Sequence, residues 1–361
     1  MRMEMKSEKN LYSNLKFIDF PKQLLAVAGE EWAPPGHIRI KPINACNHDC
    51  WYCAYHVDWL KLGDIMEYKD VLPKDKMFEI IEDIIEMKVR AVTFSGGGEP
   101  LMYPHIKECV EKLSKGGVKV AALTNGSNLK GKVADVFAEH ATWVRISIDA
   151  WDGPSYAKAR NVKEDEFEKV IQNIREFSQR KSSCVIGISF IIEEKNSSHV
   201  FDFISLMKEI GVNHVSASGC VVSNSGKENN EYHKNIKDTV VDQMNQASSL
   251  VDESFHLINN FHDLDERFDK TYDSCPFINF QTVIGANAVV YACHDKAYTE
   301  EGALGSIKDQ RFKDFWFSEE NKAAMKAINP SIHCKHHCVA DKRNHMILDY
   351  VNLDRSHIDF V

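Results

Sequence analysis

Short runs of β-branched and aromatic residues alternate with amphipathic stretches from about residue 37 onwards. Met77, Ile80, Ile81, Ile84 and Ile85, for example, recur at the spacing of one helix face. The pattern predicts strands over 37–43, 90–94, 118–123, 143–148, 184–192 and 214–218, and helices over 73–87, 106–113, 166–179 and 199–210. Such alternation specifies an α/β fold with a parallel sheet and helices outside it. Six units are fewer than the eight of a closed barrel, so we expect an open, partial (β/α)6 barrel.

The alternation stops after Gly219. A polar segment over 223–234 leads into stretches with helical spacing that continue through about residue 269. Residues 279–284 and 288–293 then predict a β-hairpin, and a last helix is expected to end near Ala327. We therefore divide the chain into an N-terminal extension (1–36), a barrel (37–220), a helical linker (221–270), a small C-terminal domain (271–340) and a tail (341–361).

Composition narrows the class of protein. The 361 residues are 43% hydrophobic and 27% charged, which is typical of a globular protein with a sizeable core. The net charge is −9 and no Lys/Arg-rich run stands out, so nucleic acid is not an expected partner. No apolar window is long enough to span a membrane, and the N-terminus lacks the apolar core of a signal peptide. We expect a cytoplasmic location.

Seven of the ten cysteines fall into two groups. Cys46, Cys50 and Cys53 lie within eight residues of one another, just after the first predicted strand. The second group is looser and consists of Cys275, Cys293, Cys334 and Cys338. The remaining three, Cys109, Cys184 and Cys220, are expected to be small buried hydrophobic residues. Grouped cysteines in a cytosolic chain indicate metal or redox chemistry rather than disulfides.

Thiolates select zinc, copper(I) or an iron–sulfur cluster. A zinc site in the first group would need a fourth ligand, for which His48 or His56 is available. In the second group, zinc could be held by the four thiolates or by a mixed set with His333, His336 or His337. A cubane cluster is the alternative, because three cysteines can hold it and leave one iron open.

The spacing C-x-x-x-C-x-x-C, with Tyr52 directly before the last cysteine, resembles the signature of the radical S-adenosylmethionine (SAM) superfamily. The resemblance implies a [4Fe–4S] cluster on Cys46, Cys50 and Cys53, and an open iron that chelates the amino and carboxylate groups of SAM. Reduction of the cluster would then cleave SAM to methionine and a 5′-deoxyadenosyl radical.

Further motifs follow in the order that this superfamily shows. Gly97, Gly98 and Glu99 resemble its GGE motif, in which bare backbone approaches the methionine end of SAM; a tight turn alone is the other interpretation. Ser147 and Asp149 resemble its S-x-D pattern for the ribose or methionine, although they could simply cap a helix. The resemblance extends to Asn125 in the turn after the third strand, and Arg160 could clamp the SAM carboxylate. We thus expect cofactor binding by Tyr52, Gly97, Gly98, Glu99, Asn125, Ser147, Asp149 and Arg160.

The second cysteine group lies in a context that resembles the SPASM/twitch extension of the same superfamily. The shared features are a hairpin that delivers Cys293, the segment Leu304-Gly-Ser-Ile307 and a following helix. The resemblance implies a single auxiliary [4Fe–4S] cluster with all four irons ligated by cysteine. The chain departs from the pattern at Ala288, where the usual hairpin has glycine.

Together the motifs imply a radical SAM oxidoreductase that abstracts a hydrogen atom from a substrate in the barrel. Because only 45 residues precede Cys46, a small substrate is favoured over a peptide, such as a sugar or nucleotide-sugar that is oxidised or epimerised. Peptide or protein modification of the SPASM type is the alternative, and a non-catalytic zinc-binding module is a third possibility. An electron donor such as flavodoxin or ferredoxin is the expected protein partner.

Overall fold

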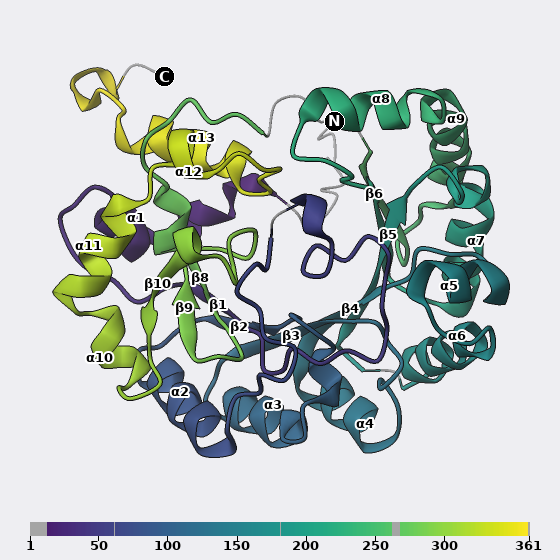
Figure 1. Cartoon of the computed structure of the whole chain (residues 1–361), viewed down its shortest axis with the longest axis horizontal. Helices are drawn as coiled ribbons and strands as arrows, with labels where there is room; N and C mark the ends of the chain where they lie inside the picture. Colours follow the sequence, from purple (N-terminus) through teal and green to yellow (C-terminus); the bar gives the residue numbers. More distant parts are fainter. Residues whose placement is uncertain (1–12, 61, 181, 262–267, 360–361) are drawn as a thin grey trace, which may run out of the picture.

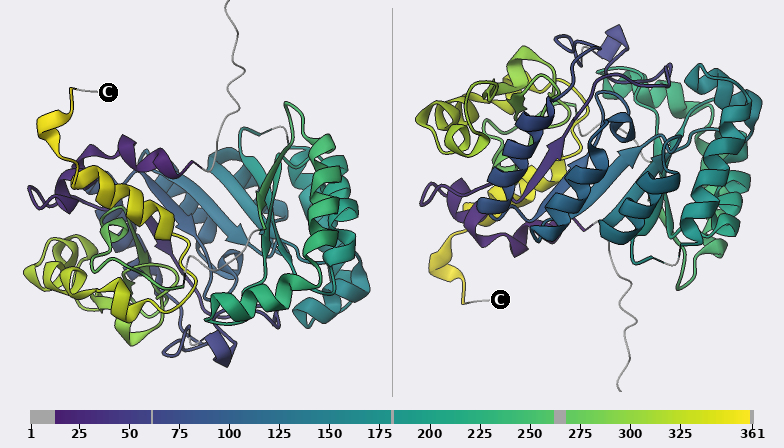
Figure 2. Two further views of the ribbon diagram at one scale, coloured as in Figure 1. Left: turned by 90° about the horizontal axis from the view of Figure 1, so that it is seen from above. Right: turned by 90° about the horizontal axis from the view of Figure 1, so that it is seen from below.

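The computed structural model describes residues 13–60, 62–180, 182–261 and 268–359. Its centre is a curved ten-stranded sheet in the order β10-β9-β8-β1-β2-β3-β4-β5-β6-β7, whose edges β10 and β7 do not meet. Helices cover the outer face of the sheet, and the other face surrounds an open interior (Figures 1 and 2). The fold is therefore an α/β partial barrel, as the alternating sequence pattern predicts.

The strands fall into one long parallel run and an antiparallel end. The parallel run consists of β1 (His37–Ile40), β2 (Ala91–Phe94), β3 (Lys119–Thr124), β4 (Ala141–Ser147), β5 (Val185–Ile192), β6 (His214–Gly219) and β7 (His256–Asn260). β8 (Gln281–Ile284) pairs in parallel with β1, and β9 (Val289–Tyr291) and β10 (Ala303–Ser306) then pair antiparallel. The predicted hairpin exists, and it continues the barrel sheet.

The helices of the barrel follow its strands in turn. They are α2 (Lys74–Glu86), α3 (Ile106–Lys115), α4 (Gly131–His140), α5 (Gly153–Arg160), α6 (Asp165–Ser178), α7 (Val200–Ile210), α8 (Gly226–Lys234) and α9 (Lys237–Ala247). At the two ends of the chain lie α1 (Pro21–Val27), α10 (Phe312–Trp316), α11 (Glu319–Ala327), α12 (Pro330–His333) and α13 (Asp341–Val351). All six predicted strands and all four predicted barrel helices are present, whereas α4, α5 and β7 were not predicted.

The main hydrophobic core lies between the sheet and its outer helices. Ile38 and Ile40 of β1 are fully buried there, whereas His37 and Arg39 point to the other face. On α2 the residues that share the predicted face, such as Ile80 and Ile84, are also fully buried. The apolar face of each strand thus meets the apolar stripe of a helix, and the inner face is left free for polar side chains.

The C-terminal segment is attached to the barrel by charged and apolar contacts. The buried Asp83 of α2 accepts two hydrogen bonds from Arg311, at 2.6 and 2.8 Å, directly before α10. A second, smaller core joins Phe17 and Leu24 near the N-terminus to Phe280 and to Ile347 of α13. Residues at both ends of the chain therefore pack together beside β8.

The segment 221–270, expected to be a helical linker, contains α8 and α9 and also β7, which pairs with β6. The expected helical stretch through residue 269 extends over residues 262–267, which lie outside the described part of the chain. Among the described residues, no helix combines the length and the apolar character that a membrane crossing requires.

The hairpin between β8 and β9 turns through a strained alanine. Ala288 has a φ of 56°, in the left-handed region that favours glycine. Its N–H donates to the carbonyl of Gly285 at 3.0 Å, and its own carbonyl accepts from Ile307 at 2.8 Å. The alanine at this position therefore adopts a backbone conformation that glycine adopts more readily.

We expect Ala288→Gly to stabilise the protein by about 0.5–1 kcal/mol, because relief of the strain exceeds the entropy lost by glycine. Thermal unfolding should show a Tm higher by about 1–2 °C. Ala286→Gly is the matched control: Ala286 lies in the same turn without a positive φ, so its replacement should lower Tm. A lower Tm for both variants would contradict the strain argument.

Candidate functional site

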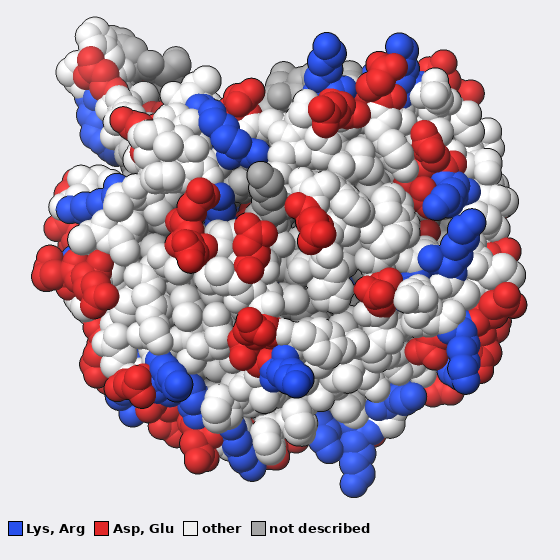
Figure 3. Space-filling view, in the orientation of Figure 1, with Lys and Arg blue, Asp and Glu red and all other residues white. Residues whose placement is uncertain are grey.

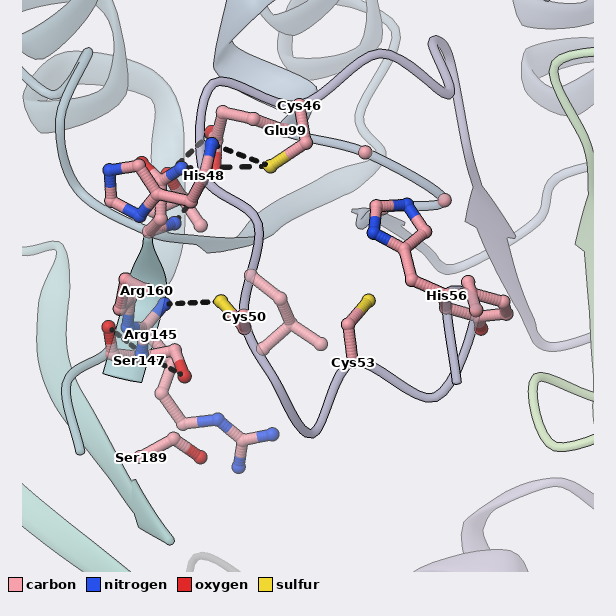
Figure 4. Close-up of a pocket in the computed structure, with 17 residues that line it drawn as sticks. Cys46, His48, Cys50, Cys53, His56, Glu99, Arg145, Ser147, Arg160 and Ser189 are labelled. Carbon is pink, nitrogen blue, oxygen red and sulfur yellow. Dashed lines mark hydrogen bonds between the residues drawn. The ribbon is translucent and has the colours of Figure 1, made fainter. Parts of the chain in front are cut away.

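A cavity of about 280 Å³ lies at the carboxyl ends of the parallel strands. It is lined by the loop after β1, by residues 96–99 after β2, and by side chains from β3, β4 and β5. Functional groups collect at this edge in parallel α/β sheets because every strand ends there. The cavity contains all three cysteines of the first group, with their sulfur atoms around a common space (Figure 4).

Two of the three sulfur atoms have hydrogen-bond donors beside them. Cys46 Sγ accepts from the His48 N–H at 3.4 Å and lies 4.0 Å from Asn125 Nδ2. Cys50 Sγ lies 3.6 Å from Nη1 of Arg160. Donors and cations of this kind stabilise a thiolate, the form of cysteine that binds iron.

Burial opposes ionisation of the same three thiols. It raises the pKa of Cys46 to about 12, together with the nearby Glu99, Cys50 and Cys53 and against the lowering effect of the hydrogen bond from the His48 N–H. Burial also raises the pKa of Cys50 and of Cys53, against the lowering effect of Arg160 on Cys50. Three thiols around one cavity are thus neutral on their own and become thiolates when a cationic metal group replaces their protons.

The glycine turn after β2 supports the cysteine loop. The Gly98 N–H donates to the carbonyl of Ile43, and the Glu99 N–H donates to that of Ala45, both at 3.1 Å. A Cβ on Gly98 would lie 2.0 Å from the carbonyl oxygen of Ala45. Gly98 lines the cavity with its backbone, but its missing side chain leaves room for the chain directly before Cys46.

Glu99 is an internal hydrogen-bond acceptor that ties β2 to β3. Its buried carboxylate accepts from Thr124 Oγ1 at 2.6 Å, from the Asn125 N–H at 2.7 Å and from the Leu101 N–H at 2.9 Å. Asn125 in turn donates from Nδ2 to Asn47 Oδ1 at 2.9 Å, within the cysteine loop. Both predicted residues line the cavity, and both also hold the loop in position.

Four other predicted residues form one hydrogen-bonded group at the end of β4. Arg160, nearly fully buried, donates to Asp149 at 2.5 Å and to the Ser147 carbonyl at 2.8 Å, and the Tyr52 hydroxyl donates to the same carboxylate. Ser147 and Arg160 line the cavity with the cysteines. Tyr52 and Asp149 are absent from that lining, so the structure places them behind it, where they fix Arg160.

The cavity also contains residues that the sequence argument did not single out, notably Tyr55, Arg145 and Ser189. Arg145 and Ser189 lie on the inner faces of β4 and β5. A charged residue in the middle of an otherwise apolar strand was the available signal for Arg145. Tyr55 follows Cys53 by two residues and donates a hydrogen bond of 3.2 Å to the carbonyl of His294.

The second group of cysteines gathers beside β8, next to that histidine. Burial and the charges of Asp295 and of the other three thiols raise the pKa of Cys293 well above its usual value. Asn344 of α13 lies 3.6 Å from Cys275 Sγ through Nδ2. The expected tail therefore contributes a helix to this group, and its boundary at 341 coincides with the first residue of α13.

Among the described residues, no three His, Cys, Asp or Glu side chains are arranged around a single metal ion. Of the histidines considered for zinc, His333 accepts at Nδ1 from the Asn329 N–H at 3.0 Å, whereas His48 lies 3.7 Å from Glu166 and neither of its ring nitrogens has a hydrogen bond. The observations that fit an iron–sulfur cluster are three partly buried thiols around one cavity, the donors at two of their sulfurs and a loop anchored by the backbone of Gly98 and Glu99.

Residues 40–207 match the profile of the radical SAM superfamily. A probable GTP 3′,8-cyclase of Sulfolobus acidocaldarius is 25% identical over 219 residues, which are 60% of this chain and 65% of the relative. An S-adenosylmethionine-dependent nucleotide dehydratase of Psychrobacter lutiphocae is 26% identical over 192 residues, 49% and 62% of the two chains. The matches thus span less than two thirds of either relative.

Two solved structures share the fold over most of this chain. Streptococcus suis SuiB bound to the precursor peptide SuiA has a TM-score of 0.61 at 14% identity, covering 84% of this chain and 69% of its own. Native anSMEcpe with bound AdoMet has a TM-score of 0.57 at 16% identity, covering 87% and 96%. At these identities the likeness concerns the fold alone.

The partial barrel, the three-cysteine loop and the profile match define a radical SAM domain. Residues 40–207 belong to the radical SAM superfamily, and SAM and a [4Fe–4S] cluster are the cofactors of this domain. The predicted superfamily and fold class are confirmed. The roles of individual residues and the auxiliary cluster stay predictions.

We expect Gly98→Ala to lose most of the iron of the first group, because its Cβ would collide with the backbone before Cys46. Gly97→Ala is the matched comparison: its Cβ would meet side-chain atoms of Asn44 and Met66 rather than backbone, so it should lose less iron than Gly98→Ala. Iron content and the visible spectrum after anaerobic purification measure the difference. Gly98→Ala protein with full iron but poor SAM binding would show that this glycine faces SAM instead.

Proposed function

We propose that this protein is a radical SAM enzyme that acts on a small substrate held inside the barrel. The observation that carries the proposal is the cavity that brings Cys46, Cys50 and Cys53 together at the carboxyl ends of the strands. When bound, the cluster and SAM supply one-electron cleavage of the S–C5′ bond and a 5′-deoxyadenosyl radical that abstracts a hydrogen atom from the substrate. Flavodoxin or ferredoxin is the proposed source of the electron.

The chain's own residues prepare the site for that chemistry. Cys46, Cys50 and Cys53 would hold the cluster, while Asn125 and Arg160 donate toward two of their sulfurs. Glu99 fixes the relative positions of the ends of β2 and β3. The backbone of Gly97 and Gly98 and the side chain of Ser147 line the space proposed for SAM. The enclosing sheet keeps water from competing for a reactive intermediate.

A small substrate is supported by the curated relatives, whose names give GTP cyclisation and nucleotide dehydration. A sugar-bearing substrate such as a nucleotide or nucleotide-sugar, with net oxidation or epimerisation, is the finer form of this proposal. Peptide or protein modification stays the alternative, because SuiB bound to its precursor peptide shares only the fold.

We also propose that Cys275, Cys293, Cys334 and Cys338 hold one auxiliary [4Fe–4S] cluster. Burial is the largest cause of the raised pKa of Cys293, and the other three thiols are close enough to raise it as well. Four cysteine ligands leave no iron open to SAM, so this cluster would serve electron transfer or structure. Removal of an electron from a substrate radical would make the net reaction an oxidation.

Replacing Cys46, Cys50 and Cys53 together by Ala tests the first cluster. We expect the triple variant to lose about half of the iron and all cleavage of SAM. The measurements are iron per chain and 5′-deoxyadenosine formed with dithionite and SAM. Cys109→Ala is the control, because Cys109 is buried on α3 outside both groups and should retain both properties. Formation of 5′-deoxyadenosine by the triple variant would refute the assignment.

The auxiliary cluster is tested by Cys334→Ala and Cys338→Ala. Each should lose about four irons per chain and much soluble yield, because the loops that carry these residues depend on metal for their order. In the triple variant above, about four irons should remain, and their spectrum should not change when SAM is added. Zinc in place of iron in that variant would refute both the auxiliary cluster and the oxidative outcome.

A further inference from the structure

The inner face of the sheet carries two arginines that the cofactor chemistry does not use. Arg39 lies on β1, on the opposite face from the buried Ile38 and Ile40. Arg145 lies on β4, opposite Val144 and Ile146, and lines the cavity beside Ser189. β2 and β3 separate the two strands, but both side chains point to the inner face of the curved sheet. Burial lowers the pKa of Arg39 to about 10, and the charge of Arg145 lowers it as well.

Neither guanidinium has a protein partner among the described residues. The Nε atoms of Arg39 and Arg145 are buried without a hydrogen bond. The other groups of these side chains form no ion pair within the described part of the chain either. Arg160, by contrast, donates to Asp149 and Ser147, and Arg311 donates to Asp83. Figure 4 shows Arg145 reaching into the cavity, with no dashed line ending on it.

The surroundings of the two arginines do not balance their charge. Asp295 is the acidic group whose charge acts on Arg39, and its carboxylate already accepts a hydrogen bond from the Val339 N–H at 3.3 Å and lies 3.1 Å from His294 Nε2. Lys41, also on this face, is nearly fully buried and donates to Tyr55 Oη at 2.6 Å and to the Gly96 carbonyl. The interior thus holds more basic than acidic side chains near Arg39.

These basic side chains of the interior are not part of a basic surface. On the face seen in Figure 3, Lys and Arg are interspersed with Asp and Glu, and several acidic side chains lie around its middle. Burying a cation without a partner is unfavourable, and two like charges near each other add to the penalty. Two arginines without a protein partner are stabilised when a ligand with negative charge binds to them, which makes them suited to anion binding.

We propose that the barrel contains an oxyanion site between Arg39 and Arg145, and that it holds a phosphate or carboxylate group of the substrate. Planar guanidinium groups match both oxyanions with paired hydrogen bonds. Neutral polar groups on neighbouring strands are available for the rest of the substrate. They are Ser189 on β5, Ser216 on β6 and Asn260 on β7. The inference rests on the proposed function, because it assigns the anion to the substrate.

The test measures binding to the cluster-loaded protein with SAM present, so that the SAM site is filled. Pyrophosphate and succinate are titrated separately by calorimetry, as probes for phosphate and for carboxylate. Arg39→Gln and Arg145→Gln should each weaken binding of the preferred probe by about 10–100-fold, the loss expected for a hydrogen bond to a charged group. Arg175→Gln, on the outer surface of α6, is the matched control and should bind like the wild type.

Arginine-dependent binding of pyrophosphate assigns the site to phosphate, and that of succinate assigns it to carboxylate. Three outcomes would overturn the inference. The wild type binds neither probe; Arg175→Gln weakens binding as much as the inner variants do; or the inner variants weaken the binding of SAM and leave that of the probes unchanged. The last outcome would mean that the arginines serve the SAM carboxylate.

Thermal unfolding distinguishes a variant that has lost the anion site from one that folds poorly. Without added anion, Arg145→Gln should unfold at the same or a higher temperature than the wild type, because it removes an unpaired, partly buried charge. The preferred probe should raise the Tm of the wild type and leave that of Arg145→Gln nearly unchanged. Formation of 5′-deoxyadenosine by the wild type is measured on the same preparation. Arginine-dependent anion binding without SAM cleavage would refute the proposed function and leave the anion site standing.

Discussion

The pairing of β1 with both β2 and β8 is the constraint on which the rest of the structure depends. In register, Ile38 is opposite Val92 on one side and Thr282 on the other. The loop after β1 carries the first cysteine group, and the β8–β9 hairpin leads to Cys293 of the second. The hairpin turn after β8 lies at the same end of the sheet as the loop after β1, but the antiparallel β9 then runs back, so Cys293 lies toward the amino end of β8. Tyr55 joins the two segments by lining the cavity and donating to the carbonyl of His294.

The two faces of this sheet meet opposite requirements. Its outer face is apolar and packs on the helices, which supplies the stability of the fold. Its inner face has His37, Arg39 and Arg145 on positions that alternate with that core. Polar groups inside a barrel reduce its stability unless they are paired, so their presence marks the part of the fold that serves binding rather than folding. Asp83 and Arg311 are an example of paired polar groups, and their contact holds the start of α10 against α2.

The sequence predicts the elements whose hydrophobic periodicity is strong, and it predicts the cysteine group whose spacing is typical of a metal-binding motif. The alternation that defines β1 to β6 and the three-cysteine motif are both local signals. β7 was not predicted because His256–Asn260 is short and polar at its end, and only its pairing with β6 makes it a strand. The role of Gly98 also depends on a long-range contact, since the atoms that exclude a Cβ belong to Asn44 and Ala45. Likewise, only the folded chain shows that Asp149 and Tyr52 lie behind the cavity, fixing Arg160.

The two cysteine groups differ in their number of thiols and in their access to the cavity, and these differences suggest which group holds a cluster with an open iron. Three cysteines cannot complete a four-iron cluster, and those of the first group face a cavity large enough to admit another ligand. The second group has four cysteines and is packed against α13 through Asn344. An open iron is therefore expected only in the first group. Arg160 lies beside Cys50, and Arg145 on β4 lines the same cavity. Under the proposed roles, the first cluster, SAM and the substrate anion would be neighbours in this cavity.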